Sequence, residues 1–237
     1  VPSDWRTAIV SRDELDRFLF GEDDIVVAVG QDGLVANVAK YLDGQPVIGV
    51  DPSPGRNAGV LVTHAPEAVA DLLADVAARR AAFGRRTMVE AAVDDGQWLV
   101  ALNEVFVGHS SHQSARYELA VGCAREQQSS SGVIIATGTG ATGWAASINR
   151  ERARPLALPA PEDAALAWFV REAWPSPATG TSLTAGLLDP PETLTLRCAL
   201  GDGAVVFGDG IEADALRAGW GQTITVGPAE RALMVVR

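Results

Sequence analysis

Lysine, cysteine and long apolar runs are nearly absent from this chain of 237 residues. Lys40 is the only lysine and lies in no motif for a P-loop or for a Schiff-base enzyme, so both chemistries are excluded. Cys123 and Cys198 are too few for a disulfide framework, which favours a reducing compartment. No stretch approaches the roughly 18 apolar residues of a membrane span, and the first residues show no signal-peptide core. These absences predict a cytoplasmic protein.

Acidic residues outnumber basic ones by 30 to 19, which gives a formal charge of −11. Such a surface repels phosphate backbones, which argues against nucleic acid and against an anionic membrane surface as the main partner. The length suits one large domain or two small interlocked domains, and a hydrophobic share of 47% suffices for a core. We therefore expect an enzyme or a small-molecule binder.

The first part of the chain alternates between strand and helix patterns. Ile25–Val29 and Pro46–Val50 are short continuous apolar runs, as in buried strands. Val35–Leu42 between them has a helical pattern, and Pro66–Phe83 has the pattern of a long alanine-rich helix. This β-α-β-α order predicts a parallel sheet.

Beyond Gly84 most of the apolar segments have strand character. The expected strands are Thr87–Val93, Gln97–Val107, Arg116–Val121, Gly132–Thr137, Glu192–Leu200, Ala204–Phe207, Gln222–Val226 and Leu233–Val236. Two helices are expected at Ala141–Asn149 and Asp163–Ala173, and a loop at Pro175–Gly186. The chain thus reads as an α/β domain over residues 1–84 followed by a β-rich domain over residues 85–237.

Gly30-Gln31-Asp32-Gly33 follows the first predicted strand, at the end of the sheet where open α/β folds place ligands. Glycines there let backbone N–H groups approach phosphate oxygens. An aspartate among phosphates makes sense as a base for a hydroxyl nucleophile or as a metal ligand. The alternative is an ordinary β-turn with Asp-Gly at its tip.

Asn103 and Glu104 interrupt an otherwise apolar run. A neighbouring amide and carboxylate can recognise an adenine edge or a pair of ribose hydroxyls, because together they offer directional donors and acceptors. A strand end that meets solvent would explain the same two residues.

Gly138, Gly140 and Gly143 have the spacing of the dinucleotide fingerprint, and they lie between a predicted strand and a predicted helix. Residues 150–161 are rich in Arg and Pro where the second strand of a hydride-transfer unit should lie, so that reading fails. A phosphate or ribose site at the start of the helix is the remaining functional reading. His109 and His112 lack metal-binding companions at zinc spacing and are expected to be exposed loop residues.

The order of four segments resembles one known family. DIVVAVGQDG (24–33) resembles the Gly-Gly-Asp-Gly-Thr turn of NAD kinases and of the related diacylglycerol and sphingosine kinases. PVIGVD (46–51), ALNEVFV (101–107) and SGVIIATGTGATGWAASIN (131–149) are similar to later NAD kinase motifs, with the mitochondrial-type branch most alike. Gly208-Asp209-Gly210-Ile211 is similar to that branch's closing Asp-Gly turn. The likeness covers about residues 24–237 and is poor over 150–190.

The resemblance implies a Rossmann-like N-terminal α/β domain and a C-terminal β-sandwich-like domain with ligands between them. It makes Asp32 the base that takes the proton from the 2′-hydroxyl of NAD. NAD would be held by Asn103, Glu104, Thr142, Trp144, Ser147, Asp209 and Gly210. The phosphates of ATP, with Mg²⁺ bound through them, would be lined by Gly30, Gln31, Gly33, Thr137, Gly138, Thr139 and Gly140. A homodimer or a larger homo-oligomer is also implied.

Three positions depart from the family pattern. Gln31 replaces the usual second glycine, Leu34 replaces the usual threonine, and Asp51 stands where the family has asparagine. The first two changes leave Asp32 intact but remove a glycine and a hydroxyl beside the phosphates. They motivate one alternative, a nucleotide-binding or sensing protein with weak catalysis. A separate alternative is a kinase for another hydroxyl, on a sugar or a lipid headgroup, which keeps Asp32 as base.

Overall fold

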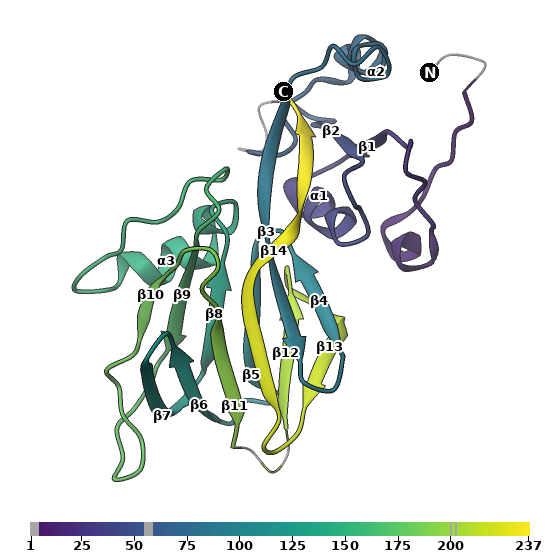
Figure 1. The fold of residues 1–237 in the computed structure, drawn as a ribbon. Helices are drawn as coiled ribbons and strands as arrows, with labels where there is room; N and C mark the ends of the chain where they lie inside the picture. The colour runs from purple at the N-terminus through teal and green to yellow at the C-terminus, as the bar shows by residue number, and fades with distance from the viewer. Residues whose placement is uncertain (1–4, 55–58, 200, 202) are drawn as a thin grey trace. The chain divides into compact units, whose positions relative to one another are not determined.

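The computed structural model describes residues 5–54, 59–199, 201 and 203–237. The chain forms two compact units (Figure 1). The first contains residues 1–86 together with 231–237, and the second contains residues 87–230. The first unit is therefore built from two separate stretches of chain.

In the first unit a small parallel sheet lies between two helices. Strands β1 (Val26–Val29) and β2 (Pro46–Val50) pair in parallel, and the end of β14 (Thr223–Val236) pairs in parallel with β2 through Met234 and Val235. Helices α1 (Asp32–Ala39) and α2 (Val69–Ala77) lie on opposite sides of these strands (Figure 1). Four of the five residues of β2 are buried, as expected for a strand covered on both faces.

The predicted helix Pro66–Phe83 is wrong in its second half. A 3₁₀ turn, η2 (Pro66–Ala68), leads into α2, and the helix ends at Ala77. Arg79 then adopts a left-handed conformation with φ of 55°, and β3 (Phe83–Val93) begins four residues later. Alanine favours helix, but this left-handed residue stops the helix. A further 3₁₀ helix, η1 (Arg12–Arg17), precedes β1.

The second unit is a sandwich of two sheets. One sheet holds β14, β11 (Leu194–Cys198), β6 (Ala115–Val121) and β7 (Ala124–Ser130) in that order, with β3 and β4 (Trp98–Ala101) also in it. The other runs β10 (Ala185–Leu188), β9 (Leu166–Arg171), β8 (Gly132–Ala136), β5 (Glu104–His109), β12 (Ala204–Gly208), β13 (Ile211–Ala218). Buried side chains from both sheets form one apolar core, as in other β-sandwiches.

Several strand boundaries differ from the sequence-based ones. The expected strand Gln97–Val107 is two strands, β4 and β5, separated by Leu102 and Asn103. Gln222–Val226 and Leu233–Val236 are both part of the single strand β14. The end of the expected strand Glu192–Leu200 falls on Leu200, which lies outside the described residues.

The helix expected at Asp163–Ala173 is a strand, β9, and this prediction was wrong. Its residues Leu166–Val170 are all buried, because β9 lies between β8 and β10 in the sheet. A short, continuously apolar run has no periodicity that could separate a buried strand from a buried helix. The expected loop Pro175–Gly186 likewise ends inside β10.

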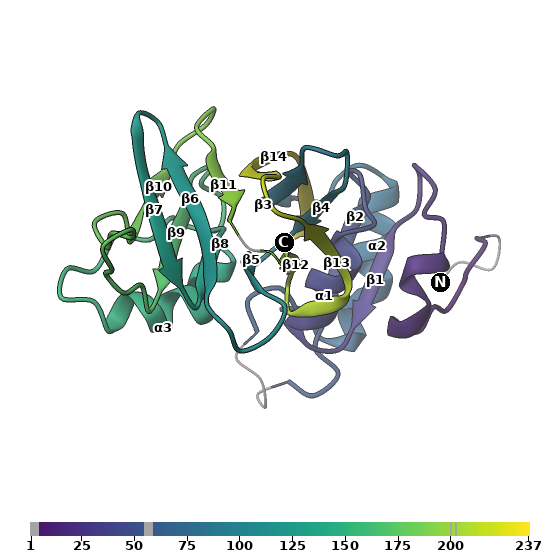
Figure 2. The same cartoon turned by 90° about the horizontal axis from the view of Figure 1, so that it is seen from below.

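Helical structure in the second unit follows β8 directly. The 3₁₀ turn η3 (Gly140–Thr142) leads into α3 (Trp144–Arg150), close to the helix expected at Ala141–Asn149. Ala145 of α3 packs with Ala167 and Phe169 of β9 in a small apolar cluster. Figure 2 shows α3 along the sheet that contains β8 and β9.

Candidate functional site

Asp32 is the first residue of α1, and its carboxylate is held by backbone of the same unit. Oδ2 accepts a hydrogen bond from the N–H of Val60 at 2.7 Å. Oδ1 accepts from the N–H groups of Leu61 and Val62, both at 3.0 Å. Three successive N–H groups therefore converge on one carboxylate, an arrangement that stabilises its negative charge. No sequence pattern had marked residues 60–62.

The turn before α1 begins where β1 ends. The N–H of Gly30 donates to the carbonyl of Val50 at 3.0 Å, which ties the turn to the end of β2. The Gln31 side chain is exposed, whereas Leu34 is half-buried, and a Cβ on Gly30 would lie 3.2 Å from its Cδ2. Leu34 thus packs against the glycine at the start of the turn.

In the second unit, Asn103 and Glu104 lie where β4 turns into β5, and Asp209 faces this bend. The Asp209 carboxylate accepts hydrogen bonds from the N–H groups of Leu102 (2.9 Å), Asn103 (2.7 Å) and Glu104 (3.3 Å). In return, the N–H of Asp209 donates to the carbonyl of Glu104 at 3.0 Å. Two predicted site segments, 106 residues apart for the Asn103 contact, are therefore in direct contact.

Glu104 is the residue of this bend with the strongest electrostatic perturbation. Burial of its carboxyl, and secondarily the negative charge of Asp209, raises its pKa from 4.5 to about 7. Glu104 therefore changes charge close to neutral pH. Perturbed carboxyls of this kind are common at ligand sites, although structural networks also produce them.

Glu104→Gln is expected to remove a loss of stability that the parent protein suffers as the pH rises. Between pH 4.5 and about 7 the folded protein keeps the Glu104 proton while the unfolded chain releases it, so the free energy of unfolding falls with rising pH. The variant should gain on the order of 2 kcal/mol relative to the parent between pH 4.5 and pH 8. Thermal unfolding of both proteins across this range measures the gain, and parallel curves would contradict it.

The turn from Thr137 to Gly140 packs against the same bend. The Thr137 hydroxyl donates to the carbonyl of Leu102 at 2.6 Å, and the Thr137 N–H donates to the carbonyl of Asn103 at 2.9 Å. A Cβ on Gly140 would collide with the Asn103 carbonyl, and one on Gly138 would collide with the Ala160 carbonyl. Thr139 is buried, and its hydroxyl has no hydrogen-bond partner among the described residues.

Three residues that were predicted to bind the nucleotide follow this turn in the sequence. Trp144 stacks on Phe106 with ring centroids 5.9 Å apart and an angle of 13°, and the Arg171 guanidinium lies 5.2 Å from the centre of the indole. The Thr142 hydroxyl donates to the Thr139 carbonyl at 3.0 Å. Ser147 Oγ accepts from Arg150 Nη2 at 3.2 Å.

The sequence did not predict that Phe106 and Arg171 contact the Trp144 ring. Phe106 is two residues beyond Glu104 on β5 and therefore points to the same side of that strand. That alternation is the one sequence signal that could have linked Phe106 to the site. Arg171 comes from β9, which had been expected to be a helix, so its place could not be anticipated.

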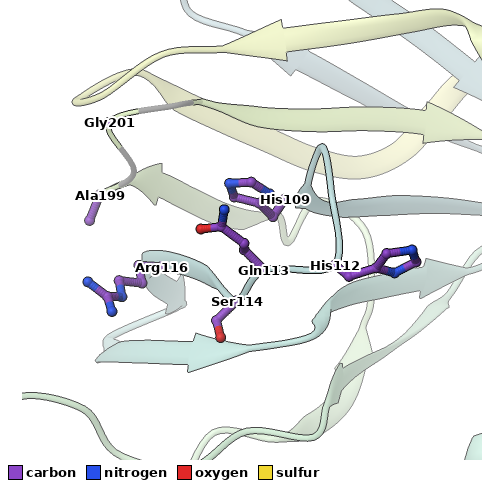
Figure 3. Close-up of a pocket in the computed structure, with 7 residues that line it drawn as sticks. All are labelled: His109, His112, Gln113, Ser114, Arg116, Ala199 and Gly201. Atoms are coloured by element: carbon purple, nitrogen blue, oxygen red, sulfur yellow. The ribbon is translucent and has the colours of Figure 1, made fainter.

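A pocket of about 410 Å³ in the second unit contains none of the predicted site residues. It is lined by His109, His112, Gln113, Ser114, Arg116, Ala199 and Gly201 (Figure 3). His109 and Gln113 point toward one another, but His112 points away from them. The side chains therefore do not converge on one ligand position.

A second pocket, of about 330 Å³, lies in the first unit beside the segment that holds Asp32. Its lining includes Asp51, Gly59, Val62 and His64. Asp51 is 7% exposed, and its Oδ1 accepts from the N–H of Ser53 at 2.9 Å.

Two kinds of feature are absent from the described residues. No three His, Cys, Asp or Glu side chains are grouped as metal ligands. No helix among those residues has the length and apolar character needed to cross a membrane.

The fold resembles that of yeast NADH kinase. The crystal structure of yeast NADH kinase complexed with NADH matches 90% of this chain and 61% of that chain, with a TM-score of 0.72 at 17% sequence identity. The expected fold class, a Rossmann-like α/β part with a β-sandwich-like part, is confirmed.

Two proteins with sequence similarity to this chain are named NAD kinases. The chain is 31% identical over 188 residues to human mitochondrial NAD kinase 2, and 36% identical over 135 residues to the NAD kinase of Cupriavidus pinatubonensis. These matches cover 60% and 53% of this chain, and the chain spans only 42% and 43% of the two relatives. No family model matches. The resemblance to the NAD kinase family predicted from the motifs is confirmed.

Proposed function

We propose that the protein is a kinase that transfers a phosphoryl group from ATP to the 2′-hydroxyl of NAD and so makes NADP. The observation that carries this proposal is the assembly in the second unit of the Asn103–Glu104 bend, the Thr137–Gly140 turn and Trp144. The bend and the turn are 35 residues apart for the Thr137–Leu102 contact, and each of the segments matches a motif of the family. The names of the sequence relatives support this activity.

In this proposal the second unit binds NAD. Asn103 and Glu104 hold the nicotinamide nucleotide through directional hydrogen bonds. Trp144 offers an indole face, while the hydroxyls of Thr142 and Ser147 fix the adenine or its ribose. The Asp209–Gly210 turn borders the same proposed nucleotide site. Backbone N–H groups of the Thr137–Gly140 turn approach phosphate oxygens.

Asp32 is the proposed base for the reaction. Asp32 Oδ1 accepts two backbone hydrogen bonds and Oδ2 one, which leaves Oδ2 a second lone pair for an incoming hydroxyl. The 2′-hydroxyl gives its proton to Asp32 while its oxygen bonds to the γ-phosphorus of ATP. The bond from that phosphorus to the bridging oxygen breaks, and ADP leaves.

Phosphate lining comes from the turn before α1. Gly30 and Gly33 allow close approach, and the exposed Gln31 amide can donate to a phosphate oxygen. Mg²⁺ would be bound by the phosphates and would neutralise their charge. A cytoplasmic homodimer or larger homo-oligomer is part of the proposal. Its support is the family resemblance and, for the compartment, two unpaired cysteines.

A second candidate function is a nucleotide sensor with little or no turnover. Leu34 packs on Gly30 where the family has a hydroxyl, and Gln31 adds a side chain beside the phosphates. A kinase for another hydroxyl, on a sugar or a lipid headgroup, would keep Asp32 as base but would not bind NAD.

Calorimetric titration with NAD, with and without Mg²⁺-ATP, separates these functions when NADP formation is followed in parallel. Binding with NADP formation is the expected result. Binding without product would establish the sensor instead. No binding at up to about 1 mM NAD, the weak end of ordinary substrate affinities, would contradict both nucleotide proposals.

A further inference from the structure

We propose that Asp209 and Thr137 are positioning residues, whose side chains hold the backbone of residues 102–104 so that Asn103 and Glu104 meet the nucleotide. Their own polar atoms are engaged with protein backbone rather than with the ligand. This inference rests on the proposed function for its link to NAD, and on the geometry of the second unit for the clamp itself.

All six backbone polar groups of residues 102–104 are hydrogen-bonded to these two residues. The three N–H groups donate to the Asp209 carboxylate. The carbonyl of Leu102 accepts from the Thr137 hydroxyl, and that of Asn103 accepts from the Thr137 N–H. The carbonyl of Glu104 accepts from the Asp209 N–H. A bend whose backbone is fully paired in this way is rigid without any ligand.

Neither side chain has much capacity left for a nucleotide. Three of the roughly four acceptor positions of the Asp209 carboxylate are used. Thr137 is fully buried, its hydroxyl donates to Leu102, and it accepts from the N–H of Gly140 at 3.2 Å. Their hydrogen bonds therefore act on the ligand through the bend.

The backbone conformation of Asp209 also supports a positioning role. Its φ of 54° is left-handed, a conformation that aspartate tolerates better than most residues. The turn between β12 and β13 takes this conformation while the carboxylate faces three N–H groups. Hydrogen bonds to a charged acceptor are about twice as strong as neutral ones, which offsets the strained φ.

Amide hydrogen exchange tests the clamp in the free protein. In Asp209→Asn one acceptor oxygen becomes an NH2 group, and the remaining oxygen is no longer charged. The exchange of at least one of the Leu102 and Asn103 amides, which donate to different oxygens, should therefore become about ten- to hundredfold faster. Glu212→Gln removes an equal charge from an exposed position three residues away and should leave both amides unchanged. Unchanged exchange in Asp209→Asn would overturn the clamp.

Two variants at Thr137 test its hydroxyl separately from its packing. Thr137→Ser keeps the hydroxyl, whereas Thr137→Val keeps the shape. We expect Ser to stay within about twofold of the parent NAD affinity and Val to lose about tenfold. The reverse order would show that packing at this site is what matters, and it would overturn the hydroxyl's role.

A double-mutant cycle decides whether Asp209 acts through Asn103. If it does, NAD affinity in Asp209→Asn/Asn103→Ala falls by clearly less than the product of the two single losses. Independent, multiplicative losses would mean that Asp209 contacts the nucleotide itself and would overturn the inference. If the parent protein does not bind NAD, the proposed function fails, while the exchange experiment still decides the clamp.

Discussion

Asp32→Asn is expected to slow NADP formation about a thousandfold, the usual contribution of a general base, while NAD affinity stays within about threefold. The same change should also lower the free energy of unfolding by about 1–2 kcal/mol. Asparagine has one carbonyl oxygen, and its NH2 group would face either the N–H of Val60 or the N–H groups of Leu61 and Val62. Initial rates should therefore be expressed per folded protein, with the folded fraction taken from thermal unfolding.

Asp71→Asn is the matched control for that experiment. Asp71 is an exposed acid in the first turn of α2, so the variant makes the same chemical change at a helix start of the same unit. Its rate should equal that of the parent. If Asp32→Asn retains the parent rate, Asp32 only anchors residues 60–62, and the base must be sought elsewhere.

Gly140→Ala is expected to destabilise the protein by about 3 kcal/mol and to lower its Tm by roughly 6–12 °C. The new Cβ would lie within collision distance of the Asn103 carbonyl, and both partners are backbone, so no side chain can rotate away. Displacement of Asn103 should weaken NAD binding in the same variant. Differential scanning calorimetry and the NAD titration measure the two effects.

Gly33→Ala provides the contrast, because a Cβ there would have no heavy atom within 4 Å. The substitution lies inside α1, where alanine is favoured over glycine by up to about 1 kcal/mol. Its Tm should be equal to or slightly above that of the parent. A normal Tm for Gly140→Ala would mean that the close approach of the two backbones does not exist in the molecule.

Much of the fold could be predicted because its strands carry continuous β-branched and apolar runs. The first parallel strand pair and β8 were predicted to within one or two residues. The errors share one cause. Where the local sequence pattern fits two secondary structures equally well, contacts with neighbouring elements decide which one forms. β9 is a strand because β8 and β10 flank it, and β14 continues through Gly227 and Pro228, where sequence rules suggest a break.

The candidate site could be predicted from the sequence as a set of residue types, but its hydrogen-bond contacts could not. Asp32, Asn103 and Asp209 could be named from their motifs. That the Asp32 carboxylate meets N–H groups 28–30 positions away, and Asp209 those 105–107 positions away, depends on how the chain folds back. Sequence motifs identify chemistry, whereas backbone partners are set by tertiary structure.

The first unit is built from two separate stretches of chain, residues 1–86 and 231–237, and this affects how it folds during translation. Its parallel sheet includes the end of β14, where Met234 and Val235 pair with β2 and His64 Nε2 lies 3.0 Å from the carbonyl of Val236. The N–H of Arg237 also donates to the carbonyl of Ala82 at 2.9 Å. A nascent chain that has emerged only through Arg86 therefore exposes one edge of β2, which must wait for the whole sandwich sequence to be translated. This unit therefore completes its folding only after the second unit has been translated, although most of its own sequence is made before the second unit.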